Sequence, residues 1–335
     1  MSDLVLKADN LKTYFSVGRH TVHAINGVSF ALRRGSTLGI VGESGCGKSV
    51  TALTIMQLLP KAARIVDGSV TFYDNLGREH ILTNYGDDSA EMRDIRGREI
   101  SMIFQDPMSS LDPVYTIGSQ VMESLRQHEK IGKKEARSRI IDMLDNLGIP
   151  IPDRRYIEYP HQFSGGMKQR VMIAIAMICN PNILIADEPT TALDVTIQAQ
   201  IISLMKELQQ KRGTSIILIT HNMGLVAETC DDIAVMYMGN IVEMGTIRQI
   251  FESPLHPYTK GLLKAVPLLG LSRGAALYSI RGNTPDPAES FAGCEFEPRC
   301  DFACEECRTD PPHDHELPDG HKVRCWLYSE GNAYA

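Results

Sequence analysis

The stretch Gly42-Glu43-Ser44-Gly45-Cys46-Gly47-Lys48-Ser49 decides the fold, because it fits the GxxxxGK[ST] pattern of a phosphate-binding loop. Thr37–Val41 before it reads as an apolar strand, and residues 49–59 after it carry apolar side chains at helical spacing. In this context, backbone N–H groups and a helix N-terminus surround phosphate oxygens. We therefore predict a nucleotide site in which Lys48 reaches the β- and γ-phosphates and Ser49 ligates Mg²⁺. The predicted contacts within the loop are Gly42, Ser44, Gly45, Gly47, Lys48 and Ser49.

Length and composition predict one large domain with an appendage. The chain has 335 residues, of which 43% are hydrophobic and 22% charged, as in ordinary compact proteins. A net charge of −7 argues against a nucleic-acid partner. The longest apolar run, residues 171–179, is too short to cross a bilayer, and the N-terminus does not resemble a secretory signal. We expect the protein to stay in the cytoplasm.

The order of apolar patterns predicts an α/β fold. A helical pattern occupies residues 115–178. Strands are then predicted at residues 183–186, 215–220 and 233–238, with a helix at 195–210. This alternation indicates a mostly parallel sheet with a helical insertion. After Phe251 the sequence is rich in Pro, Gly and Cys and has little periodicity, which predicts an irregular, Cys-rich C-terminal extension.

Two carboxylates follow the strand at 183–186. Asp187 suits Mg²⁺, directly or one step removed from it, and Glu188 suits polarising an attacking water. An acidic pair after a strand is, by itself, more often a solvated loop start. Its meaning depends on the other motifs.

Ser164, Gly165 and Gly166 open the apolar helix that follows them. Ser164 is a predicted N-cap, and the glycines expose backbone N–H groups, so this helix start can also hold an anion. The plainer interpretation is a capped core helix. Two half-sites in one chain favour a head-to-tail pair of molecules, in which each covers the nucleotide of the other.

In order and spacing, these motifs resemble those of ABC-transporter ATPases. The set comprises the phosphate loop, Gln105 in residues 103–107, Ser164-Gly165-Gly166, Asp187-Glu188, Asp194 in Thr191-Ala192-Leu193-Asp194, and His221. The resemblance covers residues 1–250. It implies a RecA-like P-loop ATPase core with a helical subdomain inserted at about residues 115–178.

The resemblance also implies roles for individual residues. Phe15, rather than its neighbour Tyr14, corresponds to the aromatic ring on which adenine stacks. Gln105 resembles the glutamine that contacts Mg²⁺ and water and connects to the membrane subunit. Glu188 corresponds to the general base, His221 to the switch histidine at the γ-phosphate, and Asp194 to the loop that communicates across the dimer.

Two members of these motifs depart from the common pattern. Phe163 and Met167 flank the Ser164 signature, and Phe163 leaves the packing of the composite site open. Cys46 replaces a common serine in the phosphate loop. It is expected to be a small filler, although a thiol there could make the protein sensitive to alkylation.

Residues 251–335 resemble the C-terminal region of oligopeptide/dipeptide importer ATPases, beginning with the 253–259 segment Ser-Pro-Leu-His-Pro-Tyr-Thr. Cys294, Cys300, Cys307 and Cys325 resemble the cysteine motif that holds a [4Fe-4S] cluster in some members. Zn²⁺ is the alternative, and unliganded cysteines are a third. The zinc alternative rests on a CxxC pair and nearby histidines, namely Cys304, Cys307, His313, His315 and His321.

The resemblance also implies the partners of the protein and its location in the cell. It predicts a second, paralogous ATPase subunit, two transmembrane permeases and an extracytoplasmic solute-binding protein, at the cytoplasmic face of a bacterial inner membrane. Peptides are the expected cargo, with nickel or a glycoside as alternatives. A non-transport ABC ATPase is a competing interpretation, but such proteins carry a long coiled coil or tandem cassettes, which the sequence lacks.

Overall fold

The computed structural model describes residues 3–18, 20–106, 110–191, 193–266, 278–289 and 291–329. Pro107 and Ala192, which belong to two predicted motifs, lie outside these residues, as do parts of the predicted C-terminal region. The chain divides into two compact units. Unit 1 comprises Met1–Val5, Leu32–Ser36 and Phe72–Ile219, and unit 2 comprises Leu6–Ala31, Thr37–Thr71 and Thr220–Ala335.

Parallel strands form the core of unit 1. β6 (Ile100–Ile103) pairs with β7 (Ile183–Asp187), and β7 pairs with β8 (Ser215–Thr220). Every residue of these strands is buried, which explains their nearly continuous apolar sequence. β7 thereby carries Asp187 and Glu188 to the carboxyl edge of the strands, where α/β sheets bind ligands.

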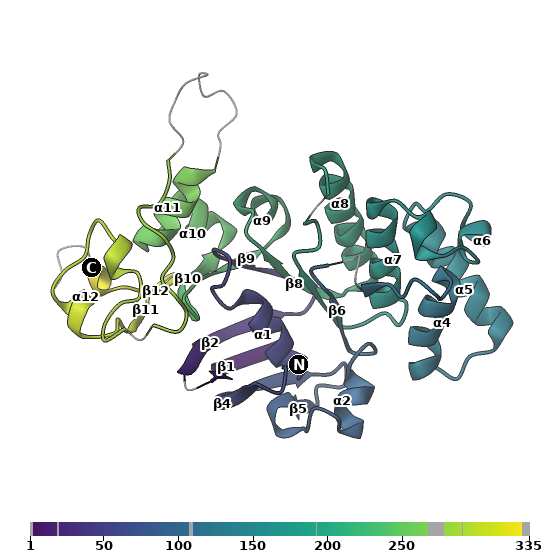
Figure 1. Cartoon of the computed structure of the whole chain (residues 1–335), viewed down its shortest axis with the longest axis horizontal. Coiled ribbons are helices and arrows are strands. Elements are labelled where there is room, and N and C mark those ends of the chain that lie inside the picture. Colours follow the sequence, from purple (N-terminus) through teal and green to yellow (C-terminus); the bar gives the residue numbers. More distant parts are fainter. Residues whose placement is uncertain are drawn as a thin grey trace, which may run out of the picture. The chain divides into compact units, whose positions relative to one another are not determined.

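Four α-helices lie between β6 and β7 in the described sequence of unit 1 and group together in Figure 1. Thr116 caps the first of them, and apolar side chains at helical spacing, such as Val121 and Leu125, are buried. The last of the four packs against β6 and against α8 (Val195–Arg212). The four are α4 (Ile117–His128), α5 (Lys133–Asn146), α6 (Pro152–Arg155) and α7 (Gly165–Met177).

Unit 2 contains the strand that precedes the phosphate loop. β3 (Thr37–Val41) pairs in parallel with β9 (Asp232–Tyr237), and β9 pairs antiparallel with β10 (Asn240–Thr246). The 37–41 strand is as predicted, whereas α1 (Lys48–Ile55) ends four residues earlier than residue 59. A second sheet orders its long strands as β2 (His20–Arg33), β1 (Leu4–Val17) and β4 (Ala63–Tyr73).

The C-terminal part of unit 2 is more regular than its sequence suggests. β12 (Lys322–Arg324) pairs with β10, with Val323 opposite Glu243, and β11 (Asp314–Glu316) pairs with β12. The α-helices described after β8 are α9 (Met223–Thr229), α10 (Ile247–Glu252), α11 (Pro257–Ala265) and α12 (Glu306–Thr309).

Shorter elements complete the described structure, and none of its helices is long and apolar enough to cross a bilayer. They are β5 (Glu79–Ile81), α2 (Ala90–Ile95) and the 3-10 helices Leu82–Asn84, Pro160–Gln162, Glu297–Arg299 and Trp326–Tyr328.

Candidate active site

The glycines of the phosphate loop are required by the packing of unit 2. A Cβ atom on Gly42 would lie 2.2 Å from the carbonyl oxygen of Met236, and one on Gly47 would lie 2.4 Å from that of Ala24. Gly47 has a φ of 105° and Gly45 a φ of 82°, a region that glycine enters without strain. The loop therefore keeps its curved backbone, from β3 into the N-terminus of α1, only with these residues.

Lys48 lies over the inside of the loop. Its side chain is buried, and Nζ donates to the carbonyl oxygens of Gly42 at 2.8 Å and Glu43 at 2.9 Å. Ser49 follows it in the first turn of α1 and is half-buried. The ammonium group and the N-terminal end of the helix both present positive charge to this loop, as an anion site needs.

Cys46 is only 1% exposed, and burial raises the pKa of its thiol. A buried, protonated thiol reacts slowly with alkylating reagents. The structure therefore favours the small-filler role and argues against the alkylation sensitivity that the sequence suggested.

Unit 1 brings the predicted base and the predicted glutamine together. The Glu188 carboxylate accepts hydrogen bonds from Gln105 Nε2 at 3.2 Å and from Thr191 Oγ1 at 2.8 Å. Glu188 adopts a φ of 46°, and its N–H donates to the carbonyl oxygen of Ile219 at 2.9 Å. A non-glycine residue held in this region costs about 1–3 kcal/mol and is typical of functional positions. Asp187, just before it, is buried at the end of β7.

Ser164 caps α7 as predicted. Its Oγ accepts from the N–H of Met167, while Ser164 and Gly165 are exposed to solvent. A Cβ on Gly166 would meet Ile197 of α8 at 3.0 Å, so this glycine allows close helix packing. Phe163 faces inward with 6% exposure, and the Arg155 guanidinium lies 5.6 Å from its ring centre.

Asp194 caps α8, because its Oδ1 accepts from the N–H of Ile197 at 3.0 Å. In unit 2, His221 is exposed directly after β8. Tyr14 stacks on His23 with ring centres 4.1 Å apart, whereas its neighbour Phe15 is half-buried.

The predicted site residues are divided between the two units. Gln105, Ser164, Gly165, Gly166, Asp187, Glu188 and Asp194 belong to unit 1, and Phe15, the phosphate loop and His221 belong to unit 2. Within unit 1 the structure joins Gln105 to Glu188, and within unit 2 it places Lys48 over the loop.

The cysteines of the C-terminal part lie near enough to influence one another: burial, together with Cys300, Cys304 and Cys307, raises the pKa of the Cys325 thiol. Cys304 and Cys307 have sulfur atoms 3.1 Å apart, and the N–H of Cys294 donates to the Cys307 carbonyl oxygen. Among the described residues, no group of three or more His, Cys, Asp or Glu side chains is arranged to hold a metal ion. His321, a predicted zinc neighbour, instead contacts Glu243 at 2.9 Å. As it stands, this arrangement does not form a complete metal site.

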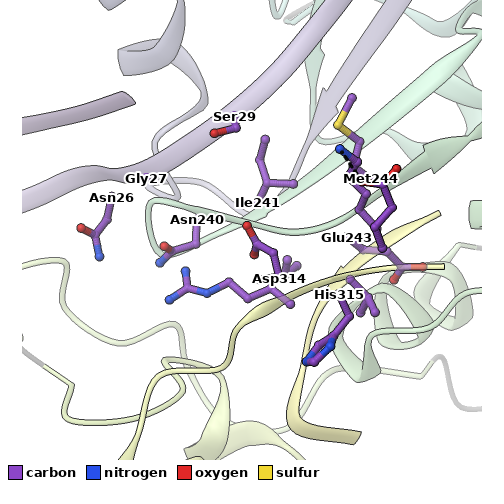
Figure 2. A pocket seen from close by; sticks show the side chains of 14 residues that line it. Asn26, Gly27, Ser29, Asn240, Ile241, Glu243, Met244, Asp314 and His315 are labelled. Atoms are coloured by element: carbon purple, nitrogen blue, oxygen red, sulfur yellow. Dashed lines mark ion pairs between the residues drawn. The ribbon is translucent and has the colours of Figure 1, made fainter. Parts of the chain in front are cut away.

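A cavity of about 250 Å³ in unit 2 is lined by residues outside the phosphate loop. Figure 2 shows its wall, which is built from segments around Asn26, Asn240 and Asp314. Asn240 is buried, and its Oδ1 lacks a hydrogen-bond partner among the described residues. The residues that line it include no predicted site residue.

Sequence reasoning missed the residues that hold Glu43. Arg299 donates to both Glu43 carboxylate oxygens, at 2.6 and 3.0 Å, and Thr284 Oγ1 donates at 2.6 Å. Although burial opposes it, these hydrogen bonds lower the pKa of the Glu43 carboxyl. The phenol oxygen of Tyr258 accepts from the Glu43 N–H at 2.9 Å. Tyr258 and Arg299 stand in the two C-terminal segments that carried the resemblance, but contacts across more than 200 residues have no local sequence signal.

Comparison with known proteins identifies both parts of the chain. Residues 25–191 match the family described as ABC transporter, and residues 242–307 match the oligopeptide/dipeptide transporter C-terminal region. The dipeptide transport ATP-binding protein DppD of Bacillus subtilis (strain 168) is 51% identical over 99% of this chain and 97% of its own. The oligopeptide transport ATP-binding protein AppD of the same organism is 48% identical over 98% of both chains.

Among solved structures, the ATP-binding cassette MJ0796, as a dimer in a post-hydrolysis state bound to ADP and Pi, matches with a TM-score of 0.63 and 27% identity. The match covers 72% of this chain and 99% of that one. The chain therefore belongs to the ATP-hydrolysing subunits of ABC transporters, in the branch that carries an oligopeptide/dipeptide transporter C-terminal region.

Proposed function

We propose that this subunit hydrolyses ATP to power the import of dipeptides or oligopeptides. The observation that carries the proposal is the intact phosphate loop, with Lys48 held inside it, in a chain 46–51% identical to proteins named for peptide transport. Nickel and glycosides are less favoured, because the relatives are named for peptides.

The arrangement supports a division of labour in hydrolysis. Lys48 and the loop N–H groups would bind the β- and γ-phosphates, and Phe15 would stack on adenine. Glu188, oriented by Gln105 and Thr191, would polarise the attacking water. Phosphoryl transfer depends mainly on positioning and charge stabilisation, which these groups provide.

Mg²⁺, when bound, supplies positive charge to the phosphate oxygens. The side chains suited to hold it are Ser49, Gln105 and Asp187, since all three offer oxygen ligands. His221 is proposed to contact the γ-phosphate, which its exposure after β8 permits.

Glu188→Gln tests the proposed base. The variant should bind MgATP like the wild type but hydrolyse it at least about 100-fold more slowly, since an amide cannot take the proton. Glu207→Gln is a matched control, because Glu207 lies exposed on α8 and forms an ion pair with Lys211 at 3.8 Å. Wild-type turnover by Glu188→Gln would remove this residue from the base role.

We further propose that two ATPase subunits pair head to tail, with Ser164, Gly165, Gly166 and Asp194 of one facing the nucleotide of the other. The exposure of Ser164 and Gly165 at the start of α7 supports this, as does the dimeric cassette among the similar structures. A second, paralogous subunit is the proposed partner. Size measurement of the purified Glu188→Gln protein with MgATP, alone and with the paralogue, distinguishes a homodimer from a heterodimer.

The proposed setting is the cytoplasmic face of a bacterial inner membrane, with two permeases and an extracytoplasmic solute-binding protein. The helices at about residues 115–178 are proposed as an inserted subdomain, and residues 251–335 as a separate C-terminal region. Co-purification from native membranes, followed by uptake of labelled dipeptides in the reconstituted complex, tests the partners and the cargo. Uptake of nickel or a glycoside instead of peptides would contradict the proposal.

A [4Fe-4S] cluster on Cys294, Cys300, Cys307 and Cys325, with Zn²⁺ as the alternative, stays a proposal. It rests on the number and spacing of the cysteines and on the nearness of Cys300 and Cys307 to Cys325, whose thiol pKa they help burial to raise. Iron, sulfide and zinc analysis of protein purified without oxygen decides between the metals. Metal-free protein of full ATPase activity would contradict both.

A further inference from the structure

Three C-terminal side chains bind one residue of the phosphate loop. Arg299, Thr284 and Tyr258 hold the carboxylate and the N–H of Glu43 at distances between 2.6 and 3.0 Å. We propose that Arg299 and Tyr258 are positioning residues for nucleotide binding, which keep the phosphate loop in its binding conformation and neutralise Glu43. This rests on nucleotide binding at the loop and goes beyond it, because it assigns that binding in part to the C-terminal region.

The side chain of Arg299 is held in one orientation by its surroundings. Arg299 has a side chain only 5% exposed, and its Nε donates to the carbonyl oxygen of Arg281 at 3.0 Å. The guanidinium carbon lies 5.7 Å from the ring centre of Tyr237 and 5.9 Å from that of Phe296. A guanidinium packed in this way is oriented before nucleotide binds, so binding costs little side-chain conformational entropy here.

The link continues to the catalytic lysine. The Glu43 carbonyl oxygen accepts from Lys48 Nζ at 2.9 Å, while the N–H of the same residue donates to Tyr258. A shift of Glu43 therefore moves an atom that holds Lys48. In an anion site, a displacement of this kind lowers affinity because the donors no longer converge on the phosphates.

The negative charge of Glu43 is a second reason to expect that Arg299 favours nucleotide binding. Its carboxylate is part of a loop that receives a triphosphate, and like charges at short range repel. Arg299 cancels this charge through a two-point contact with both oxygens. Without the guanidinium, the loop would carry an uncompensated negative charge beside the incoming phosphates.

A double-mutant cycle tests the proposal, with MgATP affinity measured on the full-length chain. Arg299→Met should weaken binding by about tenfold, because the partner of a charged pair is left alone. Arg299→Lys should recover part of that loss. Adding Glu43→Gln to Arg299→Met should return the affinity to within about threefold of the wild type, since the unpaired charge is then gone while Tyr258 still holds the backbone N–H of residue 43.

Arg308→Met is the matched control, because Arg308 is 70% exposed and pairs with Glu297 at the surface of the same segment. Tyr258→Phe keeps the ring but removes the acceptor of the Glu43 N–H, and should weaken binding by about threefold. This milder variant provides the test if Arg299→Met does not fold. At saturating MgATP, turnover of the variants should stay near the wild-type value, so that KM changes and kcat does not.

The proposal is overturned if Arg299→Met, or Tyr258→Phe in its place, binds MgATP as tightly as Arg308→Met. It is also overturned if Glu43→Gln does not restore Arg299→Met. Lys48→Ala distinguishes this failure from failure of the nucleotide site: if it abolishes binding while the Arg299 and Tyr258 variants bind normally, the site stands and the positioning role falls.

Discussion

The buried histidine at the start of α11 should make unit 2 lose stability in mild acid. His256 is 1% exposed, and its Nδ1 accepts from the N–H of Tyr258 at 3.0 Å, so the neutral ring caps the helix. Burial lowers the pKa of His256 from 6.5 to about 4, although nearby Glu243 acts in the opposite direction. The folded protein therefore keeps the ring neutral under conditions in which the unfolded chain takes up a proton.

The direction of the pH dependence follows from how many protons the folded and unfolded states bind. Because the unfolded chain binds more protons below pH 6.5, the free energy of unfolding falls as the pH drops from 6.5 towards 4. With these two pKa values, the loss between about pH 7 and about pH 5 is ~2 kcal/mol. Above pH 6.5 the contribution of His256 is fully present and the dependence flattens.

The assay is urea unfolding followed by fluorescence of Trp326, the single tryptophan of the chain, which lies in the C-terminal part of unit 2. His256→Asn is the matched variant, because asparagine can still cap the helix but does not titrate. Its stability should fall by about 2 kcal/mol less than that of the wild type over the same pH range. Equal pH slopes for the two proteins would refute the assignment to His256.

Three further predictions concern the loop and the start of α7. Gly42→Ala should weaken MgATP binding by more than about tenfold in a fluorescent-nucleotide titration, because the new Cβ would lie 2.2 Å from the Met236 carbonyl oxygen. Cys46 should stay unlabelled by iodoacetamide in the folded protein, as judged by mass spectrometry, and become labelled in urea, because it is buried and its thiol pKa is raised. Ser164→Ala should lower the free energy of unfolding by about 1 kcal/mol in urea titration, through loss of the α7 cap.

The local parts of the fold could be predicted because their signals are short. The strand Thr37–Val41, the glycine loop and the helix after it are contiguous, and the structure confirms the strand and the turn. Ser164, predicted as an N-cap, does cap α7, since its side chain accepts a hydrogen bond from the N–H of Met167. In each case the residue type and the backbone geometry are set within one turn.

The pairing of the C-terminal strands could not be predicted in this way. β11 and β12 have three residues each, too few to show alternation, and β12 is held by β10 about 80 residues earlier. Glu243 contributes to this junction through hydrogen bonds from the N–H groups of Leu255 and His256 at 2.8 Å each. Only the folded chain brings these groups together, so the segment read as irregular from its sequence.

The contact between Glu43 and Arg299 could not be predicted either, because the two residues lie far apart in the sequence. An acidic side chain in a loop that binds a triphosphate is unfavourable unless a cation neutralises it, and the nearest cation along the chain, Lys48, donates to backbone carbonyls of the loop. Arg299, 256 residues away, is that cation, and it donates hydrogen bonds to both oxygens of the Glu43 carboxylate. Because the acid and its partner lie far apart in the sequence, neither segment alone shows why an acidic side chain is tolerated in the loop. A variant of this protein that kept Glu43 but lost Arg299 would carry an unmatched charge at the site where ATP must bind.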